Sequence, residues 1–97
     1  MIPSFRHNGL QRLFDDNDPR GVNTEHVAKL KNILATLDAA PTIDHMNMPS
    51  YRLHPLKGAY KGFWAVTVRA NWRVMFRFDH GAHDVDDLDD HERETER

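Results

Sequence analysis

The stretch FWAVTVRANWRVMFRF, residues 63–78, decides how the rest of the chain can fold. Its two halves, 63–69 and 72–78, are rich in β-branched and aromatic residues and alternate in polarity, which is typical of half-buried strands. The polar segment between them suits a turn, so the stretch predicts an antiparallel hairpin. One face of this hairpin would be apolar, and the other would carry arginine side chains.

The same alternation predicts the register of the hairpin. The strongly apolar residues of both halves share a face only if Val68 lies opposite Trp72. That register predicts a loop over 69–71 with Asn71 in the left-handed conformation, and it buries Trp64 and Trp72 in the core. It also directs Arg73 away from the apolar face. A shorter, two-residue loop is the alternative, and it would mix the two faces.

Two helices are predicted upstream of the hairpin. Leu10, Leu13 and Phe14 have helical spacing, and a longer apolar stripe runs from Val27 to Leu37, with Asn23 or Thr24 as the cap. Short strands are expected at 1–6 and 51–54, and a last one at 82–88. The order of elements predicts an α+β fold, in which a helical hairpin packs on one face of a twisted, mainly antiparallel sheet.

Composition narrows the class of protein. The chain has 97 residues and no cysteine, so one domain is expected, without disulfides or thiolate metal sites. No apolar run is long enough for a membrane span, and no signal-peptide core is evident at the N-terminus. We therefore expect a cytoplasmic protein that does not bind membranes.

Charge is divided unevenly along the chain. Residues 79–97 carry nine Asp or Glu against two Arg, whereas no acidic residue lies between His45 and Phe78. Six basic residues lie in that interval: Arg52, Lys57, Lys61, Arg69, Arg73 and Arg77. A basic stretch within a predicted sheet indicates a surface for RNA, and a merely solvated face is the alternative.

Cleavage of RNA needs more than a basic surface. A base must activate the 2′-OH, cations must stabilise charge on phosphorus, and an acid must protonate the departing 5′-oxygen. Histidine can transfer protons near neutrality, and His54 and His91 flank the predicted sheet. Asp89 could orient His91. His54 could instead hydrogen-bond the local backbone before Pro55, and the remaining histidines match no metal-ligand spacing, so no metal or other cofactor is expected.

Several motifs together resemble one family. LHPLKG at 53–58, RANWR at 69–73, the terminal D-x-H at 89–91 and the N-terminal MI-x-SF-x-H-x-GL are similar to the HigB branch of the RelE-type toxins. The resemblance covers 1–91, which is the expected toxin domain, and leaves 92–97 as a charged extension. It implies a RelE-like fold and an endoribonuclease that cuts message in the ribosomal A site. It also implies a helix-turn-helix, HigA-like antitoxin, whose complex with the toxin binds operator DNA.

The resemblance also implies a site. Its catalytic residues would be His54, Lys57, Arg73, Asp89 and His91, with His91 as acid or base. Arg69 and Asn71 of the hairpin would contact RNA, and the basic face adds Lys61 and Arg77 as RNA-binding candidates.

One departure from the family pattern affects the expected activity. Asp90 occupies the position where these toxins commonly have tyrosine, and an aspartate repels phosphate. A weakened protein that still binds RNA or antitoxin therefore stays open as an alternative to an active nuclease. A gyrase-inhibiting toxin of the ParE type is a less favoured alternative, because such relatives generally lack LHPLKG and the terminal histidine.

Overall fold

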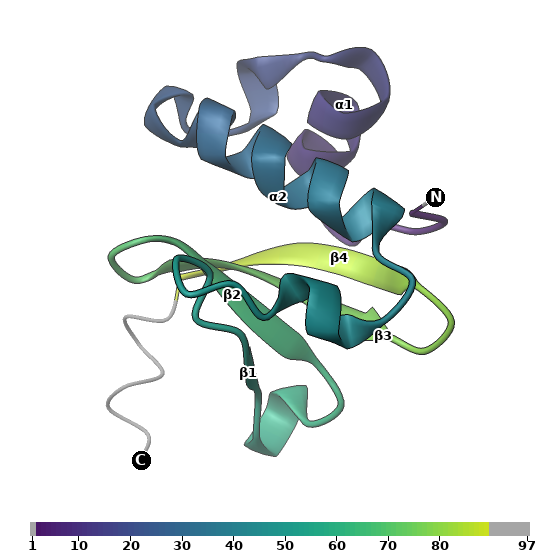
Figure 1. Cartoon of the computed structure of the whole chain (residues 1–97). Helices are drawn as coiled ribbons and strands as arrows, with labels where there is room; N and C mark the ends of the chain where they lie inside the picture. The colour runs from purple at the N-terminus through teal and green to yellow at the C-terminus, as the bar shows by residue number, and fades with distance from the viewer. Residues whose placement is uncertain (1, 90–97) are drawn as a thin grey trace.

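The computed structural model describes residues 2–89, and it has a helical layer above a sheet (Figure 1). Two α-helices precede a four-stranded sheet of order β1-β2-β3-β4, in which all neighbouring strands are antiparallel. The predicted α+β fold is therefore confirmed. No helix within residues 2–89 is long and apolar enough to cross a membrane.

The helix α1, Asn8–Asp16, is defined by caps at both ends. Nδ1 of His7 accepts a hydrogen bond from the Leu10 backbone N–H at 3.1 Å, in the manner of an N-cap. The helix ends at Asn17, whose φ of 56° places it in the left-handed conformation. Leu10 and Leu13 are buried toward the core, as the helical spacing predicts.

The helix α2, Val27–Ala39, buries the stripe of Leu30, Ile33, Leu34 and Leu37. It follows two 3₁₀ turns, η1 (Pro19–Gly21) and η2 (Thr24–His26). The side chain of Asn23 does act as a cap, but it accepts from the Glu25 N–H at 2.9 Å and thus caps η2 rather than α2. A further 3₁₀ turn, η3 (Ile43–Met46), connects α2 to the sheet.

The strand β1, His54–Pro55, is shorter than the strand expected at 51–54. Arg52 has a φ of 50°, which lies outside extended geometry, so the strand cannot begin earlier. The edge strand expected at 1–6 is reduced to one parallel bridge between Phe5 and Val85. The last strand, β4 (Ala82–Asp89), forms where it was predicted.

The hairpin of β2 (Trp64–Arg69) and β3 (Trp72–Phe78) has the predicted register along most of its length. Thr67 lies opposite Arg73, and the pairs continue in that register to the far end. The prediction is wrong at the turn, because Arg69, not Val68, lies opposite Trp72. A bulge between Thr67 and Arg69 absorbs the extra residue.

The bulge changes which residue takes the strained conformation. The loop is reduced to two residues, and Ala70 has a φ of 50°, whereas Asn71 does not have positive φ. The predicted left-handed role of Asn71 is therefore wrong. The prediction that Trp72 is buried is also wrong, because Trp72 lines an open pocket below the helices and is 38 % exposed. Trp64 packs partly buried against the main core.

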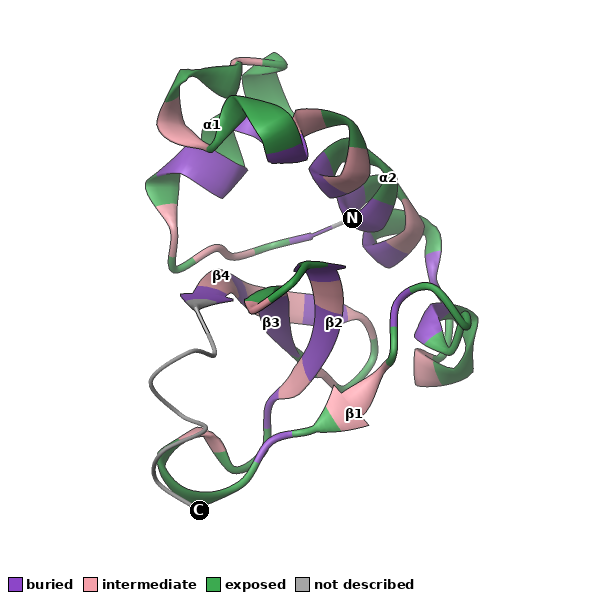
Figure 2. Cartoon of the chain, turned by 90° about the vertical axis from the view of Figure 1, so that its left-hand side faces the viewer, coloured by how far each residue is buried: buried purple, intermediate pink, exposed green. Residues whose placement is uncertain are grey.

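Two apolar clusters lie on opposite sides of the sheet. The main core fills the space between the helices and the sheet, and the buried sides of α1 and α2 face it (Figure 2). A smaller cluster lies on the other side of the sheet, partly under the loop that carries the 3₁₀ turn η4 (Gly58–Tyr60). Its buried members are Leu56, Phe63, Ala65, Met75 and Leu88. We call this second side the outer face.

Candidate functional site

The strand register places His54 and Arg73 on the outer face. His54 lies opposite Ala65, and Arg73 lies opposite Thr67 and Leu88. Residues directly opposite one another project to the same face of a sheet. From strand geometry, His54 and Arg73 are separated by about 7 Å along the strands and about 10 Å across them. Their side chains can therefore approach one phosphate from two sides.

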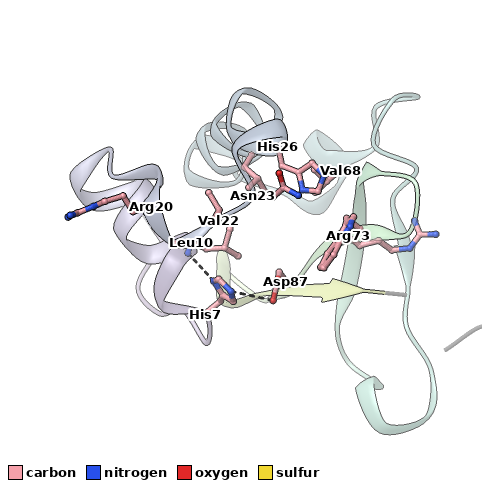
Figure 3. Close-up of a pocket in the computed structure, with 12 residues that line it drawn as sticks. His7, Leu10, Arg20, Val22, Asn23, His26, Val68, Arg73 and Asp87 are labelled. Carbon is pink, nitrogen blue, oxygen red and sulfur yellow. Dashed lines mark hydrogen bonds and ion pairs between the residues drawn. The ribbon is translucent and has the colours of Figure 1, made fainter. Parts of the chain in front are cut away.

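Arg73 is held in a defined position. Its Nη1 donates to Oγ1 of Thr67 at 2.6 Å across the β2–β3 ladder, and the side chain is half-buried. Figure 3 shows the guanidinium extending away from the space beneath the helices. Fixing an arginine in this way lowers the entropy lost when it binds an anion. The arrangement suits a cation that must meet a phosphate in one orientation.

The tautomer of His54 follows from its hydrogen bond. Nδ1 lies 3.0 Å from the backbone carbonyl oxygen of Arg52, and a carbonyl can only accept. Nδ1 therefore carries a proton, and in the neutral ring Nε2 is the nitrogen that can accept one. The backbone bond that was the structural alternative for His54 is present, and it also prepares the ring for proton transfer.

The other basic candidates come from the loop beside the sheet and from β3. Lys57 and Lys61 are exposed on either side of η4. Arg77 lies with its Cζ 4.5 Å from the centre of the Phe63 ring, and its Nε is 3.7 Å from Oδ2 of Asp84. These residues extend the basic surface beyond His54 and Arg73.

Arg69 is directed elsewhere. Its Nη1 lies 3.4 Å from Oε1 of Glu25 in η2, so the side chain reaches toward the helical layer. Asn71 lies in the two-residue turn and is half-buried. The structure thus brings His54 and Arg73 to one face, while it places the two hairpin-end residues at the rim nearer the helices.

The acidic end of the predicted site lies at the limit of the described chain. β4 ends at Asp89, whose backbone is opposite Trp72, the neighbour of Arg73. His91 lies outside the described residues. Within residues 2–89, no three His, Asp or Glu side chains cluster in a way that could hold a metal ion.

β4 also adds a carboxylate to the outer face. Asp86 lies opposite Met75 and is half-buried. Burial raises the pKa of the Asp86 carboxyl, and this outweighs the hydrogen bond from the Asp87 N–H, which lowers it. The sequence had indicated only that the C-terminal part is acidic, not which carboxylate reaches this face.

A pocket of about 360 Å³ lies between the helical layer and the sheet, and Arg73 is among the residues that line it (Figure 3). Trp72 forms part of its wall, and its ring is 6.0 Å from that of buried His26. At the opposite side, Nε2 of His7 is 3.7 Å from Oδ1 of Asp87. The sequence predicted a site role for neither histidine, although His7 belongs to the quoted N-terminal motif, because both contacts depend on packing between distant segments.

Known proteins resemble this chain over most of its length. The sequence matches, over residues 3–91, a family described as the RelE-like toxin HigB of type II toxin–antitoxin systems. It is also 44 % identical over 81 residues to a protein of Proteus vulgaris named Endoribonuclease HigB. That alignment covers 84 % of this chain and 88 % of the Proteus protein.

Proposed function

The chain belongs to the HigB-like toxins of type II toxin–antitoxin systems, and we propose that it is an endoribonuclease that cleaves message in the ribosomal A site. Its 44 % identity to Endoribonuclease HigB supports the endoribonuclease class. The proposal for the site is carried by one observation: His54 and Arg73 project to the same outer face, and Arg73 is held there by Thr67.

The proposed reaction is an internal displacement at phosphorus. The 2′-oxygen attacks the adjacent phosphate, the bond to the 5′-oxygen breaks, and the products are a 2′,3′-cyclic phosphate and a 5′-hydroxyl. In this proposal Nε2 of His54 accepts the 2′-OH proton, and the Arg73 guanidinium stabilises the charge that develops on the phosphate oxygens. His91, with Asp89 as its partner, is the candidate that protonates the departing 5′-oxygen.

The basic residues around this pair would hold RNA rather than react. Lys57, Lys61 and Arg77 are exposed and can contact phosphates of message or ribosomal RNA. Arg69 can join them if its link to Glu25, which is exposed and thus weak, is given up. Asn71 is proposed as an RNA contact from the turn.

The partners follow from the same proposal. A type II toxin has a cognate antitoxin, and we propose a HigA-like, helix-turn-helix protein that also carries the complex to operator DNA. The substrate complex is the 70S ribosome with its message, in the cytoplasm.

The test uses ribosomes stalled on a defined message. Cleavage by the wild-type protein and by Arg73→Ala is read by primer extension, with Lys31→Gln on the exposed side of α2 as a charge-matched control. We expect cuts in the A-site codon from the wild type and the control only. If folded wild-type protein makes no cut on ribosomes, the nuclease proposal is wrong, and retained RNA binding would then favour the weakened binding protein.

A further inference from the structure

A further arginine, Arg6, reaches the outer face from a part of the chain that the site does not otherwise use. Arg6 lies in the segment before α1, whose Phe5 forms a bridge with Val85 of β4. From there its guanidinium extends over the sheet, with Cζ 5.5 Å from the centre of the Phe63 ring. The sequence around Arg6 gave no indication that it would lie near β2 or β3.

Arg6 and Arg77 share one aromatic support. Arg77 lies over the same Phe63 ring, at 4.5 Å from its centre, while the ring itself is only 4 % exposed. A buried ring beneath two cations fixes their planes and leaves their outer edges available for hydrogen bonds. The Arg6 side chain is 49 % exposed and that of Arg77 is 44 % exposed, so both guanidinium groups can be reached from solvent.

The backbone beneath Arg77 is adapted to this packing. Gly62 has a φ of 96°, and a Cβ built on it would lie 3.1 Å from Nη1 of Arg77. A side chain at this position would therefore both strain the turn and press on the guanidinium. The loop ending at Gly62 thus leaves room for Arg77 on Phe63.

Two carboxylates lie beside the arginines, but neither pair is tight. Nε of Arg6 is 3.9 Å from Oδ2 of Asp86, and Nε of Arg77 is 3.7 Å from Oδ2 of Asp84. Asp84 also accepts from the Ser4 hydroxyl at 3.1 Å and faces Nδ1 of His83 at 3.5 Å, so its charge is shared. An exposed ion pair such as Arg77–Asp84 is worth roughly 0–1 kcal/mol, which a phosphate with two good hydrogen bonds can exceed.

The position relative to Arg73 indicates what would bind. Arg73 and Arg77 lie four residues apart on β3, which is about 13 Å along the strand. Arg73 is held on Thr67 and Arg77 lies over Phe63, so the two guanidinium groups are held at separate places rather than turned toward one phosphate. An RNA strand whose cleaved phosphate lies at Arg73 can therefore place a different phosphate at Arg77.

We propose that Arg6 and Arg77, stacked on Phe63, form a second phosphate-binding subsite for RNA on the outer face. This subsite rests on the nuclease function proposed above and extends it, because Arg6 becomes an RNA-positioning residue. The phosphate can come from the message or from ribosomal RNA, and both offer the same chemistry to a guanidinium pair.

The experiment compares Arg6→Gln, Arg77→Gln, the double variant and Lys31→Gln, which removes one positive charge from α2. Binding to programmed ribosomes is measured at several salt concentrations, with a message that carries a 2′-deoxy nucleotide at the cleavage position. We expect each arginine variant to bind roughly five- to tenfold more weakly. The slope of log affinity against log salt should fall by about 0.7 for each phosphate that the protein no longer neutralises, and Lys31→Gln should leave it unchanged.

A second set of binding measurements identifies which RNA supplies the phosphate. The message is shortened nucleotide by nucleotide on either side of the A-site codon. If the weaker binding caused by Arg6→Gln disappears on a shortened message, the phosphate belongs to the message; if the weaker binding persists, the phosphate belongs to ribosomal RNA.

Three controls keep the outcomes distinct. Arg6→Lys keeps the charge and should retain the salt slope. Circular dichroism shows whether each variant is folded, so that loss of the cation can be told apart from a folding defect. If wild-type protein binds and cleaves while Arg6→Gln matches Lys31→Gln, the second subsite is wrong and the nuclease proposal stands. If Arg6→Gln weakens only antitoxin binding, the surface around Arg6 and Arg77 is a protein interface, and the proposed RNA subsite is likewise wrong.

Discussion

The Arg73 guanidinium donates to the Thr67 hydroxyl at 2.6 Å, across the hairpin ladder whose register was predictable. This bond joins a half-buried cation to a neighbour on the opposite strand. It makes Thr67 a positioning residue, because Thr67 fixes where the Arg73 charge lies.

Thr67→Val removes the hydroxyl and preserves the shape of the side chain. We expect the rate of message cleavage to fall roughly 3- to 10-fold, since one net hydrogen bond is removed while the cation remains. Arg73→Ala should cost on the order of 10²–10³. Single-turnover cleavage on programmed ribosomes measures both. Equal rates for Thr67→Val and wild type would remove Thr67 from the positioning of Arg73.

His54→Gln keeps a polar side chain on the outer face but cannot transfer a proton at neutral pH. If Nε2 of His54 accepts the 2′-OH proton, the rate should fall roughly 10²–10⁴-fold with little change in ribosome binding. The decisive measurement is the rate at saturating enzyme beside the dissociation constant. A decrease confined to binding would make His54 an RNA contact rather than a proton-transfer group.

Ala70→Gly tests the turn. Ala70 has a φ of 50°, where a Cβ costs on the order of 1 kcal/mol and glycine avoids this cost. Relief of this strain opposes the greater backbone entropy of glycine in the unfolded chain, so we expect a small gain in the free energy of unfolding. Asn71→Gly, at the residue without positive φ, should lose stability in the same urea titration. If Asn71→Gly gained stability and Ala70→Gly lost it, the result would support the three-residue loop over 69–71.

Gly9→Ala should be strongly destabilising, because the added Cβ would overlap the backbone carbonyl oxygen of Gly21. Backbone atoms of η1 cannot move aside without separating from α1, so a loss of about 2 kcal/mol or more is expected. Gly81→Ala is the matched control, since a Cβ there meets nothing within 4 Å. Thermal unfolding of both variants checks the prediction, and equal melting temperatures would contradict it.

Asp86→Asn should stabilise the protein at neutral pH. The pKa of the Asp86 carboxyl is raised above its ordinary 3.8, chiefly by burial, so ionisation is less favourable in the folded state than in the unfolded one. The resulting loss of folding free energy is absent below the pKa that Asp86 has in the unfolded chain. It grows as pH rises toward the pKa of Asp86 in the folded protein, and it is constant above that pKa. Removing the carboxylate should therefore raise Tm at pH 7 but not near pH 3. An equal shift at both pH values would assign the effect to packing.

Much of the fold could be predicted because its signals are local. The alternation from Trp72 to Phe78 predicted β3 and the register of most of the hairpin, and the stripe in α2 predicted a buried helix face. The register also placed Arg73 on the outer face. His54 and Arg73 could thus be expected near one another, although the Thr67 bond that holds Arg73 could not.

The sequence by itself determined the elements and the facing of their side chains, since a strand or helix period is encoded by neighbouring residues. Only the tertiary structure decided which distant segments meet. Trp72 came to lie beside His26 of η2, and the bridge between Phe5 and Val85 carried Arg6 onto the outer face. The physical reason is that such contacts depend on how whole layers pack, and no periodicity within either segment records its partner.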